Sequence, residues 1–166
     1  MNNENLADFA CRIYAHKNIE RLSRQLQDHH YANINIILWL CWLDKEEIHL
    51  HQTALDEGID LIGEITGEIV TLLRHAREQT IKIGGFSRTQ EQVIGKNILQ
   101  AEIAVEKILL ERLQEMTNKL KKIQDAGTDP LSLFDYLLSL RVPEPAATAG
   151  ELLNAERQAN PEGLKS

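Results

Sequence analysis

Between residues 88 and 125, apolar side chains recur every three or four positions and stay on one side of a helix. At 1.5 Å per residue, one helix over this range would be roughly 55 Å long. The preceding GGFSRTQ (84–90) contains two glycines, which favour a helix end, and a capping box formed by Ser87 and Gln90. Because another apolar stripe, over 59–82, ends at these glycines, the sequence predicts a long helical hairpin.

The rest of the chain shows the same helical period, and strict alternation of apolar and polar residues persists nowhere. Segment 33–44 is apolar on every side, as expected of a helix surrounded by other helices. Its β-branched residues would also suit a strand, but the only other candidate strand is IKIGGF at 81–86, which favours a helix. We therefore predict an all-α, single-domain helical bundle of five to seven helices with one long helical hairpin. The expected helices cover residues 4–15, 19–30, 33–44, 46–56, 59–82 and 88–125.

Beyond the long helix, the sequence offers one more helix and then changes composition. Asp129 can cap, and Pro130 can open, a helix over PLSLFDYLLSL. The far end of the long helix, from about Met116, must project, bend or be covered, and we expect this next helix to fold back over it. After Arg141 the chain becomes rich in proline, alanine and glycine. The predicted domains are a bundle over 1–141 and a flexible C-terminal tail over 142–166 with one short helix.

Composition narrows the class of protein. A formal net charge of −7 disfavours binding of nucleic acid, because like charges raise the cost of approaching phosphates. The longest apolar run, 36–43, is too short to cross a membrane, and the N-terminus lacks the pattern of a secretory signal. We therefore expect a cytoplasmic protein. Cys11 and Cys41 both lie in apolar patterns and are predicted to be buried free thiols.

Two carboxylates on the long helix contradict its amphipathic pattern. At about 100° per residue, Glu102 falls inside the apolar stripe and Glu106 at its edge. A buried carboxylate needs a cation, and Arg74 and Arg77 lie on the other arm of the hairpin. The expected direct partner of Glu102 is Arg74 or a residue of the first helices. Three interpretations stay open: a salt-bridge network, a ligand-binding or catalytic pair, and chance exposure at the edge. If its partner is buried, losing Glu102 should cost about 3 kcal/mol or more.

A second polar group precedes the apolar helix, in LQDHHYAN (26–33). We expect Asn33 and Asn35 to satisfy the free N–H groups at the helix start, and Asp28 to tie the preceding turn. The nearby histidines resemble metal ligands, but only Glu46 and His49 have the spacing of a di-iron bundle, so no metal is predicted. The candidate site is a polar interior cluster that would bind a ligand or fix the helices. Its members are Asp28, Asn35, Arg74, Arg77, Glu102 and Glu106.

Other chemistries find little support. The acids of DEGID (56–60) repeat as in enzymes that hold magnesium and diphosphate, but no second acid-rich helix faces them, which favours a solvated surface. Phosphate-cradling glycine loops and nucleophile–histidine patterns are absent from the sequence. The sequence therefore indicates no cofactor and no catalytic residue.

Three stretches carry a resemblance to a known family: LQDHHYANINIILWLCWL (26–43), LLRHAR (72–77) and AEIAVEKILLERL (101–113). They resemble an uncharacterised proteobacterial family of about 160 residues, a DUF2390-like domain of unknown function. Tyr31, Ala32 and Asn33 depart from the Gly- and Asp-containing turn of that family. The resemblance implies no activity, cofactor or partner. It matches this chain at Leu26, Gln27, Asp28, Asn35, Trp42, Arg74, Arg77, Glu102 and Glu106.

Two functional hypotheses follow. The leading one is a non-enzymatic cytoplasmic helical protein that binds another protein, or a second copy of itself, through the exposed end of the long helix or through the tail. This reading expects neither a membrane nor a nucleic acid as partner. The alternative is a small-molecule- or metal-binding enzyme that uses Glu102 and Glu106 in the bundle interior. The sequence leaves open whether the chain is an enzyme.

Overall fold

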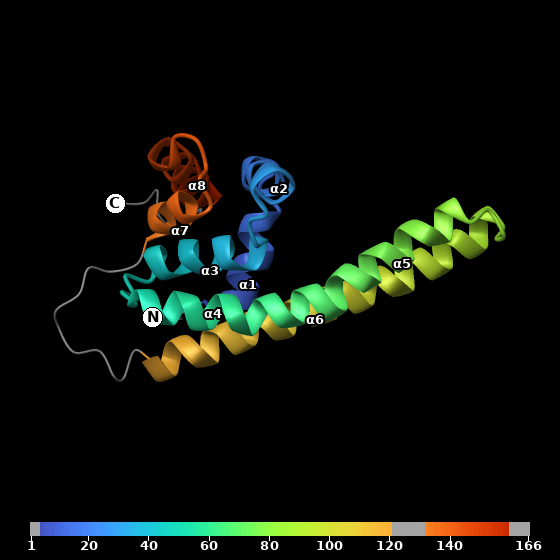
Figure 1. The fold of residues 1–166 in the computed structure, drawn as a ribbon, viewed down its shortest axis with the longest axis horizontal. Coiled ribbons are helices and arrows are strands. Elements are labelled where there is room, and N and C mark those ends of the chain that lie inside the picture. Colours follow the sequence, from blue (N-terminus) through green and yellow to red (C-terminus); the bar gives the residue numbers. More distant parts are fainter. Residues whose placement is uncertain (1–3, 121–131, 160–166) are drawn as a thin grey trace.

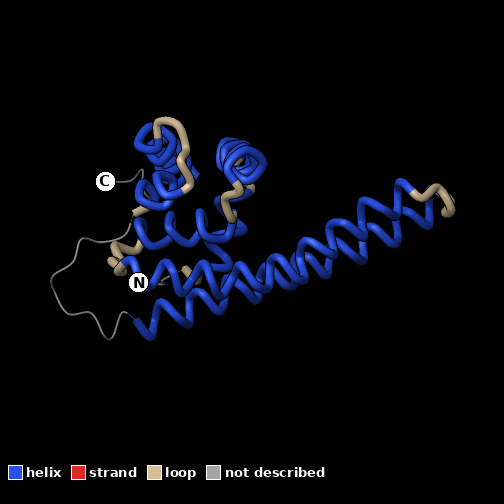
Figure 2. Tube along the Cα trace, viewed as in Figure 1, coloured by secondary structure: helices blue, strands red, loops and turns tan. Residues whose placement is uncertain are grey.

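The computed structural model describes residues 4–120 and 132–159, and these residues form helices joined by short loops, without a strand (Figure 2). Because the helix over 52–82 continues through a π-helical turn without a break, the described residues contain seven helical rods. This confirms the predicted all-α bundle of five to seven helices with one long hairpin. The elements are α1 (Leu6–Tyr14), α2 (Lys17–His30), α3 (Ile34–Lys45), α4 (Gln52–Ile65), η1 (Thr66–Val70), α5 (Thr71–Lys82), α6 (Arg88–Leu120), α7 (Leu133–Ser139) and α8 (Pro145–Ala159).

Helix α3 lies at the centre of a globular body, where it contacts α1, α2, α4, α6, α7 and α8. Its first turn is capped by Asn33, whose side chain accepts a hydrogen bond from the Asn35 N–H. Trp39 is fully buried and its Nε1 donates to Thr117 Oγ1 of α6 at 2.9 Å. Thr117 in turn donates to the Leu113 carbonyl at 2.8 Å, which satisfies every polar atom of this contact. The indole therefore fixes α6 against the body.

The long hairpin projects from this body as a two-helix arm, with α4, η1 and α5 running antiparallel to α6 (Figure 1). The tip of the arm is the turn between Lys82 and Arg88, where Gly84 has a positive φ of 67° and Ser87 exchanges hydrogen bonds with Gln90. These are the predicted helix stop and capping box.

The π turn rotates α5 relative to α4. At η1 the Thr71 N–H bonds to the Thr66 carbonyl, five residues back, so the turn holds one extra residue. One residue corresponds to about 100° of helix rotation. The single apolar stripe predicted over 59–82 is therefore divided, because Ile62 is fully buried whereas Leu72 is 63% exposed.

The predicted break between helices 46–56 and 59–82 is wrong, because the helix begins at Gln52 and passes through Gly58 without interruption. A Cβ atom on Gly58 would lie 2.8 Å from Trp39 Cζ3 and 3.3 Å from Leu113 Cδ2. Gly58 therefore permits the close approach of α4 to α3 and α6, and does not end a helix.

The end of α6 that projects is the opposite of the one expected. Leu113 and Thr117, near the predicted free end, are fully buried against the body, and the arm projects at the turn instead (Figure 1). Among the described residues, α7 contacts α3 and α8 and does not cover α6. Helix α7 begins after Ser132, which forms a capping box with Asp135. The predicted cap at Asp129 and Pro130, and positions 121–125 of the long helix, lie outside the described residues.

The segment predicted as a flexible tail contains α8, a helix of 15 residues that packs on α2 and α7. Its residues Ala149, Leu152 and Ala155 are buried at helical spacing. Pro145 occupies the first position, where a helix needs no N–H donor. The change of composition after Arg141 therefore marks a turn into another packed helix up to Ala159, and residues 160–166 lie outside the described range.

The two cysteines differ in exposure, although both are free. Cys41 is buried in α3, and this burial raises the pKa of its thiol. Cys11 is exposed on α1, so the expectation that both thiols are buried is wrong for this residue. None of the described helices combines the length and the apolar character that a membrane crossing requires.

Candidate functional site

Two arginines and two glutamates form an ion-pair cluster across the hairpin. From α5, Arg77 Nε donates to Glu102 Oε1 at 2.8 Å, and Arg74 Nη2 donates to Glu106 Oε1 at 2.7 Å. Arg74 Nε also lies 3.6 Å from Glu102 Oε2, so one guanidinium links both carboxylates. The four residues that the helical period places on facing arms are thus brought together.

The two sides of this cluster differ in exposure. Glu102 is only 3% exposed, whereas the side chains of Arg74 and Arg77 are 35% and 38% exposed. The carboxylate therefore depends on cations that reach it from the surface. Burial raises the pKa of Glu106, and the charge and hydrogen bond of Arg74 oppose this rise. The hydrogen bond that Arg77 donates to Glu102 raises the pKa of Arg77.

The predicted direct partner of Glu102 was Arg74 or a residue of the first helices, but the shortest contact is with Arg77. Counting residues from the turn misses the direction of the side chains. Side chains lean toward the N-terminus of their own helix, so in an antiparallel pair Arg77 reaches away from the turn and Glu102 reaches toward it.

The other two members of the predicted cluster lie elsewhere. Asp28 is on the exposed face of α2 and forms no ion pair or hydrogen bond with any residue that the structure describes. Asn35 is buried in the first turn of α3, where its N–H is bonded to the Asn33 side chain. The six residues therefore form one four-membered cluster and two separate positions.

The chemistry open to the cluster is limited. The carboxylates accept hydrogen bonds from guanidinium groups, which are permanent cations and cannot act as bases at neutral pH. Within residues 4–120 and 132–159, no group of three or more His, Cys, Asp or Glu is arranged to hold a metal ion. What the arrangement provides is a fixed register between two helices, because only one offset pairs both acids.

A second polar cluster, absent from the sequence predictions, joins both ends of the chain to the body. The Arg12 guanidinium donates to Glu4 Oε1 and Oε2 at 2.8 and 2.7 Å and to the Ala159 carbonyl at 3.0 Å. Lys45 lies 3.4 Å from Glu4, and these cations lower the pKa of that carboxyl. The sequence gives no local pattern that predicts this cluster, because Arg12 and Ala159 are 147 residues apart along the chain.

Glu156 lies beside this cluster, is buried, and has an Oε1 atom without a hydrogen-bond partner among the described residues. Its pKa is raised, mainly because burial penalises the charge, although Arg12 and Lys45 oppose the rise. Because the pKa of this carboxyl is higher in the folded state, the folded state binds the proton more tightly than the unfolded state does. The free energy of unfolding therefore falls as the pH rises from the unfolded pKa of 4.5 through the folded pKa.

We expect Glu156→Met to remove the free-energy cost of burying this charged carboxylate. The free energy of unfolding of the variant should exceed that of the wild type by of the order of 1 kcal/mol at pH 7, and the difference should shrink as pH falls toward 4.5. Urea denaturation at several pH values measures it. Glu106, whose pKa is also raised, contributes the same pH dependence to the free energy of unfolding of both proteins, so its contribution cancels in the difference. A difference that does not change with pH contradicts the assignment.

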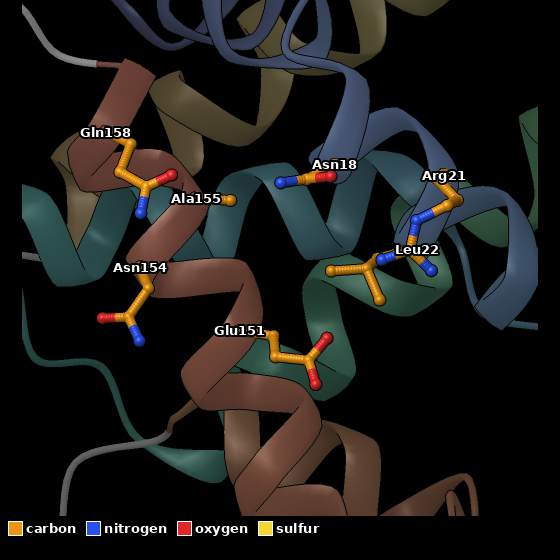
Figure 3. Close-up of a pocket in the computed structure, with 7 residues that line it drawn as sticks. All are labelled: Asn18, Arg21, Leu22, Glu151, Asn154, Ala155 and Gln158. Carbon is orange, nitrogen blue, oxygen red and sulfur yellow. The ribbon is translucent and has the colours of Figure 1, made fainter.

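A pocket of about 160 Å³ lies between α2 and α8. Figure 3 shows Asn18, Arg21 and Leu22 on the α2 side and residues of α8, including Glu151, on the other. Its volume is below the range of roughly 300–1,000 Å³ typical of small-molecule sites. The lining is mainly of exposed polar side chains that lie on the surface of their helices. The residues that line this pocket therefore indicate no specific ligand or reaction.

The hairpin carries most of the exposed apolar surface. Nine of the thirteen large apolar residues that are exposed in the described chain lie between positions 69 and 108. An apolar face that remains exposed on a soluble helix marks an interaction surface more often than a single exposed residue does. The nine are Ile69, Leu72, Ile81, Ile83, Phe86, Val93, Leu99, Ile103 and Ile108.

These residues divide between two sides of the hairpin. Arg74 and Glu106 contact each other, so they mark one side, called here the charged flank. At about 100° per residue, Ile81, Leu99 and Ile103 fall on the same flank. The opposite side is the uncharged hairpin face, with Ile69, Leu72 and Ile83 from η1 and α5 and Ile94, Ala101 and Ile108 from α6.

The sequence contained a signal for this face that the predictions did not use. Positions 69, 72, 76 and 83 repeat at heptad spacing, in addition to the inward positions 70, 73, 77 and 80. A helix that carries two such sets and lies outside the body must expose one of them. The end of the long helix that was predicted to be an exposed interaction surface is instead in contact with the body through Leu110, Leu113 and Thr117.

Comparison with known proteins gives a match to one family. A sequence model described as "Protein of unknown function (DUF2390)" matches residues 5–113, which include α1 to α5 and the part of α6 that holds both glutamates. The matched region thus contains the ion-pair cluster and both sides of the hairpin. No curated protein and no solved structure matches the chain.

Proposed function

The chain belongs to the DUF2390 family of proteins of unknown function, and we propose that it is a non-enzymatic protein that binds another protein through the uncharged hairpin face. The observation that carries this proposal is Leu72, which is 63% exposed near the base of the projecting arm and has further exposed isoleucines on the same side. Covering this surface with a second apolar face would remove it from water and release about 25 cal/mol per Å².

The ion-pair cluster supports the proposal as a structural element of the arm. A two-helix arm that projects into solvent has few tertiary contacts to hold its register. Two buried or half-buried acids paired with arginines define that register, so the apolar residues of α5 and α6 stay side by side on one face. This pairing gives the glutamates a role that does not require catalysis.

The enzymatic alternative needs Glu102 and Glu106 to be available to a ligand. Both carboxylates are engaged by guanidinium groups at hydrogen-bond distance, and Glu102 is almost inaccessible. A substrate or cation would have to displace Arg74 or Arg77 to reach them. These contacts favour the binding function over the enzymatic one.

Affinity capture with matched variants tests the proposal. A tagged chain is expected to retain a protein from native cell extract, either a second copy or a different protein, and Leu72→Glu should abolish this retention. Ile81→Glu is the control, because Ile81 is 67% exposed on the same helix but on the charged flank. Equal retention by both variants, or none by the wild type, argues against binding through this face.

A further inference from the structure

The uncharged hairpin face is accessible along its whole length, because the body packs on the other side of α6. Leu110 is buried and Gln114 accepts a hydrogen bond from the Leu6 N–H, and both lie about 80–120° from Glu102 on the Glu106 side. Ile108, on the opposite side, remains 50% exposed although it lies next to the body. A long, flat partner can therefore lie along α5 and α6 without meeting α1 or α3.

The charge distribution limits what can cover this face. On the uncharged side, positions from Ile69 to Ile83 and from Ile94 to Ile108 contain only apolar residues, alanine, threonine, glutamine and asparagine. A partner that presents charge would lose its hydration there without gaining a counter-ion. The partner must instead present an uncharged apolar surface of two-helix width, and this chain itself carries such a surface.

The size of the face suits a weak dimer that dissociates readily. From Ile69 to Ile83 the face is roughly 21 Å long at 1.5 Å per residue, and two helices side by side are about 20 Å wide. Pairing two copies would bury roughly 840 Å², which is below the size of stable specific interfaces, about 1,200–2,000 Å², and falls among weak, transient ones. The negative net charge of each copy does not oppose contact at the face, since the charged side chains point elsewhere.

We propose that two copies of this chain associate through their uncharged hairpin faces and form a four-helix bundle. This inference rests on the proposed function and names the partner. The pairing is isologous, so each copy contributes the same surface and a two-fold axis closes the assembly. On α5 the large residues Leu72 and Ile83 flank Ala76, and on α6 Ile94 and Ile108 flank Ala101. Each helix thus provides the alternation of large and small residues that interdigitating helices need.

Sedimentation equilibrium of the purified chain tests the dimer. We expect a mass of twice 18.9 kDa that dissociates on dilution through the micromolar range. Ile108→Lys places two lysines in the symmetric interface and should weaken association at least about 100-fold. Ile103→Lys is the matched control, because Ile103 is also 50% exposed on α6 but lies on the charged flank, and it should leave the dimer intact.

The results distinguish a failure of the dimer inference from a failure of the proposed protein-binding function. A wild-type chain that stays monomeric at all concentrations overturns the dimer. If that monomer still captures a different protein, and Leu72→Glu abolishes the capture, the hairpin binds a heterologous partner and the proposed function stands. A dimer that Ile103→Lys disrupts, and Ile108→Lys does not, places the contact on the charged flank and overturns the inference.

Discussion

Replacing Arg74 and Arg77 together with methionine should lower the free energy of unfolding by about 3–5 kcal/mol, because Glu102 is left buried without a cation. Methionine keeps much of the side-chain volume, so the effect comes mainly from the lost charge. Urea denaturation at neutral pH, followed by circular dichroism, measures the difference. The slope with urea should stay unchanged, since the same surface is exposed on unfolding.

Adding Glu102→Leu to this double variant should recover most of the loss, since a buried ion pair replaced by apolar groups costs little. Arg24→Met is the control for removing a surface cation. Arg24 pairs with Glu20 on exposed α2, where the side chains are 63% and 43% exposed, and its loss should cost less than about 0.5 kcal/mol. A triple variant as unstable as the double one would show that the arginines act through packing rather than charge.

The cluster could be predicted from sequence because charge neutralisation is a local requirement. A glutamate inside an apolar stripe needs a cation, and Arg74 and Arg77 were the cations on the facing arm. The distribution of exposure within the cluster could not be predicted. Sequence reasoning assigned the largest cost to the loss of Glu102, if its partner is buried. Both guanidinium groups are instead more than one third exposed and can hydrate, so the larger cost falls on removing the cations.

The fold shows the same division between local and long-range signals. The capping box at Ser87 and the asparagine cap at Asn33 act within three residues, and the structure confirms both. The passage of the helix through Gly58 depends on what packs against α4, and the π turn at Thr66–Val70 adds a residue that the regular helical period does not predict. The length of helix α8 was underestimated for the same reason. Its apolar stripe is short and stabilises the helix only when it packs against α2 and α7.

The position of the interaction surface illustrates a further limit. Periodicity shows that α5 and α6 are apolar on more than one side, but only the position of the body decides which side stays exposed. The body packs on α6 from about Leu109 onward, through contacts of α1, α3 and α4. The projecting part of the hairpin is therefore the end nearest the turn, and no local pattern in α6 indicates this.

Gly58→Ala should destabilise the protein by about 1–2 kcal/mol, although alanine favours helices over glycine by about 1 kcal/mol. The added Cβ would lie 2.8 and 3.0 Å from two indole carbons of Trp39. That ring is fully buried and held by the hydrogen bond to Thr117, so it cannot move aside without losing a buried contact. Overpacking of this kind costs roughly 1–3 kcal/mol, which exceeds the gain in helix propensity.

Gly63→Ala, five residues along the same helix, separates these two effects. Gly63 is exposed and a Cβ there meets nothing within 4 Å, so the substitution should stabilise the protein by up to about 1 kcal/mol. In a Trp39→Phe background, Gly58→Ala should cost less, because phenylalanine lacks the indole atoms nearest the new methyl group. Thermal unfolding of the wild type, the three single variants and the Trp39→Phe/Gly58→Ala double variant measures both differences. If Gly58→Ala stabilises as much as Gly63→Ala does, α4 does not approach Trp39 closely and the packing of the arm on the body differs from that described.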